Sequence, residues 1–273
     1  MKNNNILYLT SFNERLYRAT GQYMIDSFIR CRIEGDLLAT YEGNPSYIVN
    51  PQQIDSHNED QQFFFYNLDQ DTFLQDWIEA NRDIIPPKYG GDCLAFEDKE
   101  SGKWTNDTDQ TWITGFNFQA ARFFRKIASI NYAMRYSSDY ELVVLLDCDT
   151  LFKKYLPEKV ILDTINDKEV LYHLGCNRRL RGTGIEAGFM VFRTSSAFPR
   201  LVIECYISGQ FRQYNRWDDG FIYRKVLEEH PEIPTIDVVP DHQEKVGGHV
   251  IPYSIFGEYV DHFKGSNQRA GII

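Results

Sequence analysis

The stretch Leu142-Val143-Val144-Leu145-Leu146-Asp147-Cys148-Asp149-Thr150-Leu151-Phe152 decides how the whole chain is interpreted. Its first part, Leu142–Leu146, is a continuous apolar run, which is typical of a strand buried on both faces of a mostly parallel sheet. Because side chains alternate along a strand, Asp147 and Asp149 are expected on one side and Cys148 on the other. Ligands of open α/β sheets bind beyond the carboxyl ends of the strands, so this pair of acids is predicted to face a ligand.

Two carboxylates at this spacing repel each other unless a cation or a hydrogen-bond donor lies between them. A hard divalent ion that takes oxygen ligands is the natural partner, and such an ion also binds a diphosphate. We therefore interpret Asp147 and Asp149 as a candidate site for Mn²⁺ or Mg²⁺. The alternative is a purely structural one, in which Asp149 and Thr150 cap a solvated turn after the strand.

Predicted strands and helices alternate on both sides of this stretch. Strands are predicted at residues 6–10, 36–41, 142–146, 170–173, 189–192 and 236–239, and helices at residues 16–32, 69–82, 118–136, 157–165, 195–206 and 218–229. Residues 50–62, 86–111 and 175–184 are predicted to be loops, and residues 253–273 form a weakly patterned tail. The alternation predicts an α/β fold with a mostly parallel, mixed central sheet flanked by helices.

Composition limits the possible partners and compartment. The chain of 273 residues has 39 acidic and 29 basic side chains, a net charge of −10, which argues against a nucleic-acid partner. Its five cysteines form no pattern with zinc spacing, which fits reduced thiols in a cytoplasmic protein. No signal peptide and no apolar run of transmembrane length is visible. The oligomeric state stays open.

Several blocks of the sequence resemble a known superfamily. The segment YELVVLLDCDTLF (140–152) resembles the DxD strand of GT-A fold glycosyltransferases, and ARFFRKIASINYAMRY (121–136) is similar to the helix that precedes it there. Three later blocks follow in the order found in the glycogenin-like and lipopolysaccharide galactosyltransferase families. These are GIEAGFMVF (184–192), RWDDGFIYRKVLE (216–228) and DHFKGSN (261–267). Each block alone is a weak signal, and their order is the specific part.

Three positions depart from the pattern of those families. Glu186 stands where Asn is usual, and Asp219 stands where Gln is usual. In the last block His262 and Gly265 have the usual spacing, but Gln268 stands where Lys would fall. The departures leave the subfamily, the donor and the stereochemistry open.

The resemblance implies one Rossmann-like GT-A domain over residues 1–273, with a nucleotide-binding half at about 1–152 and an acceptor-binding half at about 153–273. It implies a metal-dependent enzyme that moves a sugar, with a hexose favoured, from a nucleotide-diphosphate sugar to a glycan or another hydroxyl acceptor. A UDP-sugar donor is favoured. Retention of the anomeric configuration is favoured, and inversion stays open.

The resemblance also implies roles for particular residues. Asp147, Asp149 and His262 would hold Mn²⁺ or Mg²⁺. Near the reacting carbon, Asp219, Asp218 and Glu186 would act as a general base or would stabilise an oxocarbenium-like centre. The expected contacts to the nucleotide-sugar are Thr10, Ser11, Phe12, Tyr17, Arg122, Lys126, Asp147, Cys148 and Lys264.

Structural interpretations compete with several of these roles. Asp218 and Asp219 also fit a helix N-cap and an acid in the first turn. Tyr17 can simply pack, and the basic helix residues Arg122 and Lys126 can be solvated. The basic run at residues 177–181 lies over an acceptor or only keeps its loop in water.

Two other functional classes remain as alternatives. Phosphohydrolases of the haloacid dehalogenase type also carry DxD after a strand, although as DxDGT near the N-terminus. A non-catalytic carbohydrate-binding module would use the 17 Tyr, 19 Phe and 4 Trp to stack on sugars. Aromatic side chains in such numbers more often fill a core.

Overall fold

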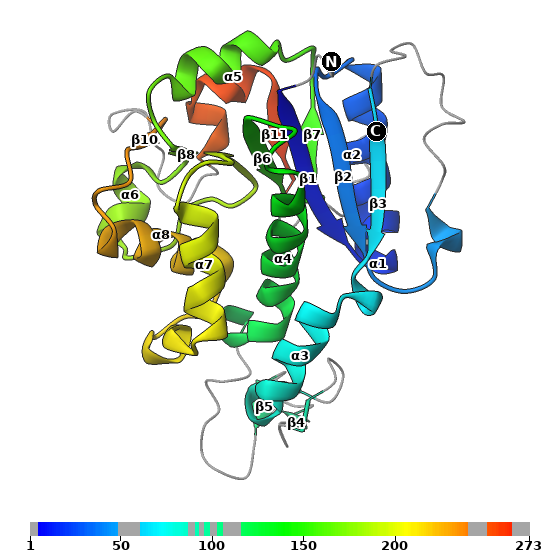
Figure 1. Cartoon of the computed structure of the whole chain (residues 1–273), viewed down its shortest axis with the longest axis vertical. Helices are drawn as coiled ribbons and strands as arrows, with labels where there is room; N and C mark the ends of the chain where they lie inside the picture. The colour runs from blue at the N-terminus through cyan, green and yellow to red at the C-terminus, as the bar shows by residue number, and fades with distance from the viewer. Residues whose placement is uncertain are drawn as a thin grey trace.

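The computed structural model describes residues 5–48, 61–86, 91–92, 96–98, 103–105, 116–239 and 250–263. Its centre is a seven-stranded sheet with the order β10-β8-β9-β6-β1-β2-β3 (Figure 1). The strands of this sheet are β1 (Ile6–Phe12), β2 (Asp36–Tyr41), β3 (Phe63–Asn67), β6 (Leu142–Leu146), β8 (Val170–Tyr172), β9 (Phe189–Arg193) and β10 (Thr235–Asp237). Six of the seven run in one direction, and β9 runs antiparallel to its neighbours β6 and β8. The predicted α/β fold with a mostly parallel central sheet flanked by helices is confirmed.

The two central strands are buried because both of their faces are apolar. On β6, Val143 and Leu145 enter one hydrophobic core, whereas Leu142, Val144 and Leu146 enter the other. This alternation follows from the two-residue repeat of a strand, and it requires a layer of helices on each face of the sheet. The strand predicted from the continuous apolar run is therefore buried on both faces, as expected.

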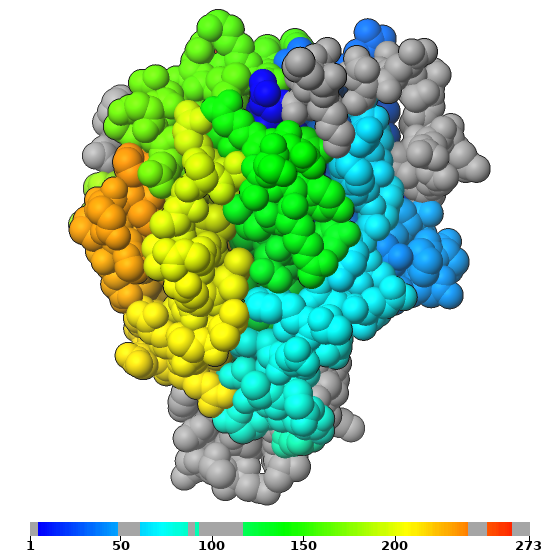
Figure 2. Space-filling view, in the orientation of Figure 1, coloured from blue at the N-terminus to red at the C-terminus, as the bar shows by residue number. Residues whose placement is uncertain are grey.

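Helices cover both faces of the sheet. The helices α3 (Thr72–Ala80), α4 (Ala120–Ala133), α7 (Phe198–Ile207) and α8 (Asp219–Glu229) pack on one face, and α2 (Gln22–Arg30) and α5 (Glu158–Ile165) pack on the other. Figure 2 shows the side chains of α3, α4 and α7 as a continuous surface over the first face. Under this surface the rings of Trp77 and Phe124 stack with their centroids 4.0 Å apart.

The remaining elements are short. They are α1 (Glu14–Leu16), α6 (Gly175–Leu180), a π-helical turn η1 (Tyr17–Gly21), and the 3₁₀ turns η2 (Pro45–Tyr47), η4 (Leu68–Gln70), η5 (Arg82–Ile84), η8 (Phe116–Phe118), η9 (Met134–Tyr136), η10 (Gln210–Gln213), η11 (Ile251–Tyr253) and η12 (Ile255–Glu258). Two antiparallel pairs lie outside the main sheet, β4 (Phe96–Asp98) with β5 (Lys103–Thr105), and β7 (Thr150–Phe152) with β11 (Val260–His262). The second pair sets His262 opposite Thr150, next to the predicted DxD motif.

The structure corrects three expectations about local structure. The predicted loop at 175–184 begins with the helix α6, because the carboxylate of Asp237 accepts hydrogen bonds from the backbone N–H groups of Leu174 and Gly175 at 3.0 and 2.9 Å. The strand β3 was not predicted, and the predicted tail contains β11. The predicted helix at 16–32 is divided into α1, η1 and α2. Most of the predicted loops at 50–62 and 86–111 lies outside the described residues.

Two further expectations concern cysteines and membranes. Cys31, Cys148, Cys176 and Cys205 are free thiols, and Cys93 lies outside the described residues. Among the helices that the structure describes, none combines the length and the apolar composition that crossing a bilayer requires.

Replacing Phe124 by Ala should lower the free energy of unfolding by about 3–5 kcal/mol, because it leaves a cavity beneath Trp77 in a closely packed core. Urea unfolding followed by circular dichroism measures this change. Tyr23→Ala is the control, since the Tyr23 side chain is 40% exposed and should cost less than about 1 kcal/mol. Equal effects of the two substitutions would contradict the described core.

Candidate functional site

A cavity of about 560 Å³ opens at the carboxyl ends of β1 and β6. Its walls come from the segment after β1, from α4, from the DxD turn, from residues 185–187 and from the start of α8. Both predicted halves of the chain therefore contribute to it. The position agrees with the rule that ligands of open α/β sheets bind beyond the ends of the strands.

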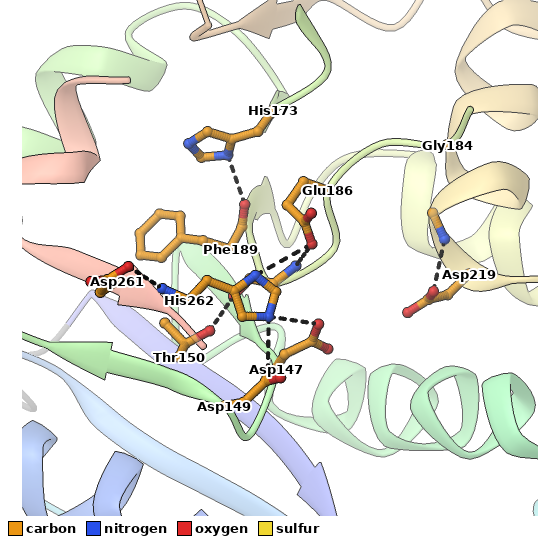
Figure 3. Close-up of polar contacts among 12 residues, drawn as sticks. Asp147, Asp149, Thr150, His173, Gly184, Glu186, Phe189, Asp219, Asp261 and His262 are labelled. Atoms are coloured by element: carbon orange, nitrogen blue, oxygen red, sulfur yellow. Dashed lines mark hydrogen bonds and ion pairs between the residues drawn. The ribbon is translucent and has the colours of Figure 1, made fainter. Parts of the chain in front are cut away.

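The two acids of the DxD motif lie on this wall, and the buried His262 contacts them from behind it. The Nε2 atom of His262 is 2.8 Å from Asp149 Oδ1 and 3.5 Å from Asp147 Oδ2, and its Nδ1 atom is 3.4 Å from Glu186 Oε1 (Figure 3). Single ligand atoms of Asp147, Glu186 and His262 all lie within 4.8 Å of one another, a spacing that one metal ion can bridge. Of the three residues predicted for a metal site, Asp147 and His262 belong to this group with Glu186, and Asp149 contacts His262 outside it.

Backbone geometry fixes the position of His262. The backbone of the DxD turn is tied to Gly188, because the N–H of Asp147 and the hydroxyl of Thr150 both donate to the Gly188 carbonyl, at 3.2 and 2.7 Å. A Cβ atom on residue 188 would lie 2.2 Å from the His262 ring. Only glycine leaves room here for the imidazole. The second glycine of the block GIEAGFMVF, Gly188, therefore allows His262 to reach the DxD turn.

The acids around His262 favour its charged form. Burial alone would lower the pKa of His262, but hydrogen bonds to Asp147 and Asp149 and the nearby charge of Glu186 raise it to about 9. In the metal-free protein the imidazolium therefore supplies positive charge between the carboxylates. A metal ion bound to the same nitrogen would have to replace that proton.

Lys126 is the second cation within the acidic group. From α4 its ammonium donates to Asp147 and also to Asp219, the latter at 2.6 Å. Burial opposes the charge of Lys126, but the two carboxylates outweigh it and hold its pKa well above the usual value. The DxD motif is thereby linked to the start of α8.

Two backbone segments meet closely beside this pair. The N–H of Ile185 donates to the carbonyl of Gly220 at 2.9 Å, and a Cβ on Gly184 would lie only 2.3 Å from the Gly220 backbone. Glycine at both positions allows this contact, which holds the segment that carries Glu186 against the start of α8, which carries Asp219.

The two acids at the start of α8 have different surroundings. Asp218 is the N-cap, as the structural interpretation predicts, and it accepts from the N–H of Phe221 at 3.3 Å and from Arg216 at 2.8 Å. Burial raises the pKa of Asp218, although Arg216 opposes the shift. Asp219 instead faces Lys126 and accepts from the N–H of Gly220 at 2.9 Å. Both acids line the cavity.

The predicted contacts to a nucleotide-sugar fall into three groups. Residues that line the cavity are Ser11, Phe12, Arg122, Lys126, Asp147 and Cys148. Thr10 and Tyr17 are buried away from it, and Tyr17 packs against Phe12 and Tyr47 with ring centroids 5.1 and 5.5 Å apart. Lys264 lies outside the described residues.

Cys148, between the two acids, is less reactive than an ordinary thiol. Its Sγ lies 3.7 Å from the Thr20 hydroxyl, and burial together with the charge of Asp149 raises its pKa to about 12. The residue touches the cavity wall, but its side chain remains largely buried, as the strand alternation predicts.

Several basic residues of the cavity were missed or left without a role by the sequence. Arg15, Arg125, Arg178 and Arg216 join Arg122 and Lys126 on the wall. Arg125 pairs with Glu42 at 2.6 Å, Arg178 with Glu186 at 2.6 Å, and Arg216 with Asp218 at 2.8 Å. Arg178 belongs to the basic run at 177–181 and Arg216 to the block at 216–228, but no sequence pattern says which side chains of these segments turn inward. The cavity wall therefore carries six basic and six acidic side chains, a local balance that is less negative than the chain as a whole.

No protein-family model matches the chain, and no curated protein matches it. Among solved structures, the chain is similar to the apo crystal structure of mouse xyloside xylosyltransferase 1. The identity is 12%, the match covers 86% of this chain and 85% of that chain, and the TM-score is 0.49. A likeness this low carries no conclusion about activity, so the proposed function depends on the residues of the cavity.

The stability of the metal-free protein should depend on His262. Because its pKa is higher in the folded state than the ordinary value of 6.5, the stabilisation is complete below pH 6.5 and is lost as the pH rises through about 9. The loss should approach about 3 kcal/mol at 1.36 kcal/mol per pKa unit. Urea unfolding with EDTA between pH 6 and 9.5 measures it. His262→Gln should remove this part of the pH dependence, and an unchanged profile in that variant would show that another group is responsible.

Proposed function

We propose that the protein is a metal-dependent glycosyltransferase that moves a sugar from a nucleoside diphosphate sugar to a hydroxyl acceptor. The observation that carries the proposal is the contact of the buried His262 with Asp147 and Asp149, two acids on the wall of a cavity that six basic side chains also line. A cation and several basic groups together are what a diphosphate leaving group needs. The block order that resembles GT-A glycosyltransferases supports the same reaction.

The residues present fit a divalent cation. Carboxylate oxygens suit Mg²⁺ and Mn²⁺ alike, whereas an imidazole nitrogen in the same set favours the softer Mn²⁺. Asp147, Asp149 and His262 would hold the ion, whose chemical contribution is to stabilise the negative charge that develops on the leaving diphosphate. We therefore propose Mn²⁺ as the preferred cofactor.

The chain's own residues would bind and orient the donor. Arg15 and Arg122 lie on the cavity wall and can contact phosphate oxygens. Ser11 and Phe12, the last two residues of strand β1, line the part of the wall proposed for the nucleoside. Uridine is favoured, and the two halves of the chain would act as one domain around the cavity.

Asp219 is the proposed residue at the reacting carbon. Lys126 joins Asp219 to Asp147, so the carboxylate has a fixed position between the proposed cation site and the start of α8. With retention, which the resembling families favour, Asp219 would stabilise an oxocarbenium-like centre. With inversion, Asp219 or Asp218 would take the proton of the acceptor hydroxyl.

Binding of a nucleoside diphosphate should require the cation. With Mn²⁺, UDP should raise the melting temperature, because a ligand that binds only the folded protein stabilises it. The rise should disappear with EDTA and in Asp149→Asn, and it should be smaller with Mg²⁺. A thermal-shift panel of nucleotides with each ion measures these effects.

Asp167→Asn is the matched control for this panel, because Asp167 pairs with Lys168 on the surface. It should bind UDP with Mn²⁺ as the wild type does. If no nucleoside diphosphate binds with either ion, the proposed function is wrong. Hydrolysis of an aryl phosphate in place of nucleotide binding would indicate a phosphohydrolase.

Asp219→Asn should lower the turnover of UDP-sugar by about 10²- to 10⁴-fold, the usual range for a lost acid or base, while Mn²⁺-dependent UDP binding persists. Release of UDP from a panel of UDP-sugars measures turnover. Asp71→Asn is the control for helix capping, because Asp71 caps α3 outside the cavity lining and Asn caps a helix about as well as Asp. Loss of UDP binding in Asp219→Asn would contradict a role limited to the reacting centre, and NMR of the product anomer separates retention from inversion.

A further inference from the structure

Carboxylates face both nitrogens of the His262 imidazole. Asp149 and Asp147 lie beside Nε2, and Glu186 lies beside Nδ1, with its Oε1 atom 3.4 Å away (Figure 3). The ring cannot shift toward Gly188, whose backbone it touches. His262 is therefore held between a pair of acids on one side and a single acid on the other.

Glu186 is itself rigidly held. Its side chain is 2% exposed, and its Oε2 atom accepts from Arg178 at 2.6 Å. Its Oε1 atom, which faces His262, accepts from the N–H of Gly188 at 3.3 Å. Its own N–H donates to the carbonyl of His173 at 2.8 Å. Both carboxylate oxygens are thus engaged, which does not suit a residue that must approach a sugar carbon or an acceptor hydroxyl.

An imidazole that gives one nitrogen to a cation carries its proton on the other nitrogen. A carboxylate beside that second nitrogen selects the tautomer, fixes the ring and increases the basicity of the ligating nitrogen. In this site the nitrogen on the DxD side is Nε2, so the proton belongs on Nδ1, toward Glu186. The Glu186 Oε1 atom lies 3.4 Å from Nδ1 without the geometry of a hydrogen bond, so Glu186 is the acceptor within reach of that proton once the ring and the carboxylate align.

We propose that Glu186 is a positioning residue, which holds the His262 ring so that Nε2 faces a divalent cation shared with Asp147 and Asp149, and that Arg178 holds Glu186 in turn. This inference rests on the proposed function for the presence of the cation. It replaces the role near the reacting carbon expected for Glu186. It also gives a reason for the departure from the resembling families, because Asn at this position is neutral and shorter by one methylene group.

The affinity for Mn²⁺ alone tests the proposal. Electron paramagnetic resonance of the free ion gives the dissociation constant for the wild type and for Glu186→Gln, which keeps the size of the side chain. Removal of a group that orients a metal ligand typically weakens binding by about 10- to 100-fold, and the variant should fall in that range. Glu141→Gln is the control, because Glu141 also pairs with an arginine, Arg193, but precedes β6 whereas Asp147 follows it.

A second variant separates orientation from loss of fold. The amide that Glu186→Gln introduces has one acceptor oxygen in place of two. That oxygen can face Arg178 or His262, but not both. Adding Arg178→Met to Glu186→Gln should free that oxygen for His262 and restore part of the Mn²⁺ affinity. A variant that had merely lost its fold would gain nothing from this second change.

Electron spin-echo spectroscopy of bound Mn²⁺ supplies a signature of the histidine. The ¹⁴N coupling should be present in the wild type, absent in His262→Ala, and weaker in Glu186→Gln at saturating Mn²⁺. Unchanged affinity and coupling in Glu186→Gln would overturn the positioning role while the proposed function stands. Failure of the wild type to bind Mn²⁺ would instead contradict the metal dependence of the proposed function, and with it this inference.

Discussion

Repulsion among carboxylates is the constraint on which this site depends. Asp147, Asp149, Glu186 and Asp219 converge from three separate segments, and in a largely buried region their charges must be balanced. In the metal-free protein Lys126 and His262 lie between them and offset half of that charge, and Arg178, paired with Glu186, offsets a further part. Removal of either cation would leave buried acids uncompensated, so the acids and the cations must be understood as one group.

Close backbone approaches make that convergence possible. Gly188 gives the His262 ring its place, and the contact of Gly184 with Gly220 brings the 184–188 segment to the start of α8. The short ribbon of β7 and β11 then carries His262 from a distant part of the sequence to the DxD turn. Glycine is needed at these contacts, because a side chain at any of these positions would push the charged groups apart.

Local patterns in the sequence predicted the buried central strand Leu142–Leu146 and, through the N-cap Asp218, the start of α8. They could not predict the helix α6, because its cap, Asp237, lies 62 residues further along the chain than the N–H group it accepts from. The same limit applies to the site. The resemblance placed the DxD acids beside His262, and the structure brings them within contact distance. It did not say that Glu186 would turn toward His262, because the direction of a side chain depends on packing between distant segments.

Charge balance connects the replacement at position 186 with the rest of the site. Asp147, Asp149 and Asp219 carry three negative charges, and Lys126 offsets one, which leaves two for a divalent cation when His262 is neutral. An unpaired glutamate would have added a further negative charge, but Glu186 enters with Arg178 as an ion pair of zero net charge. The pair therefore adds a directed acceptor beside His262 and leaves the charge that a cation must neutralise unchanged. On this argument Arg178, in the basic segment 177–181, belongs to the proposed metal site as much as Glu186 does.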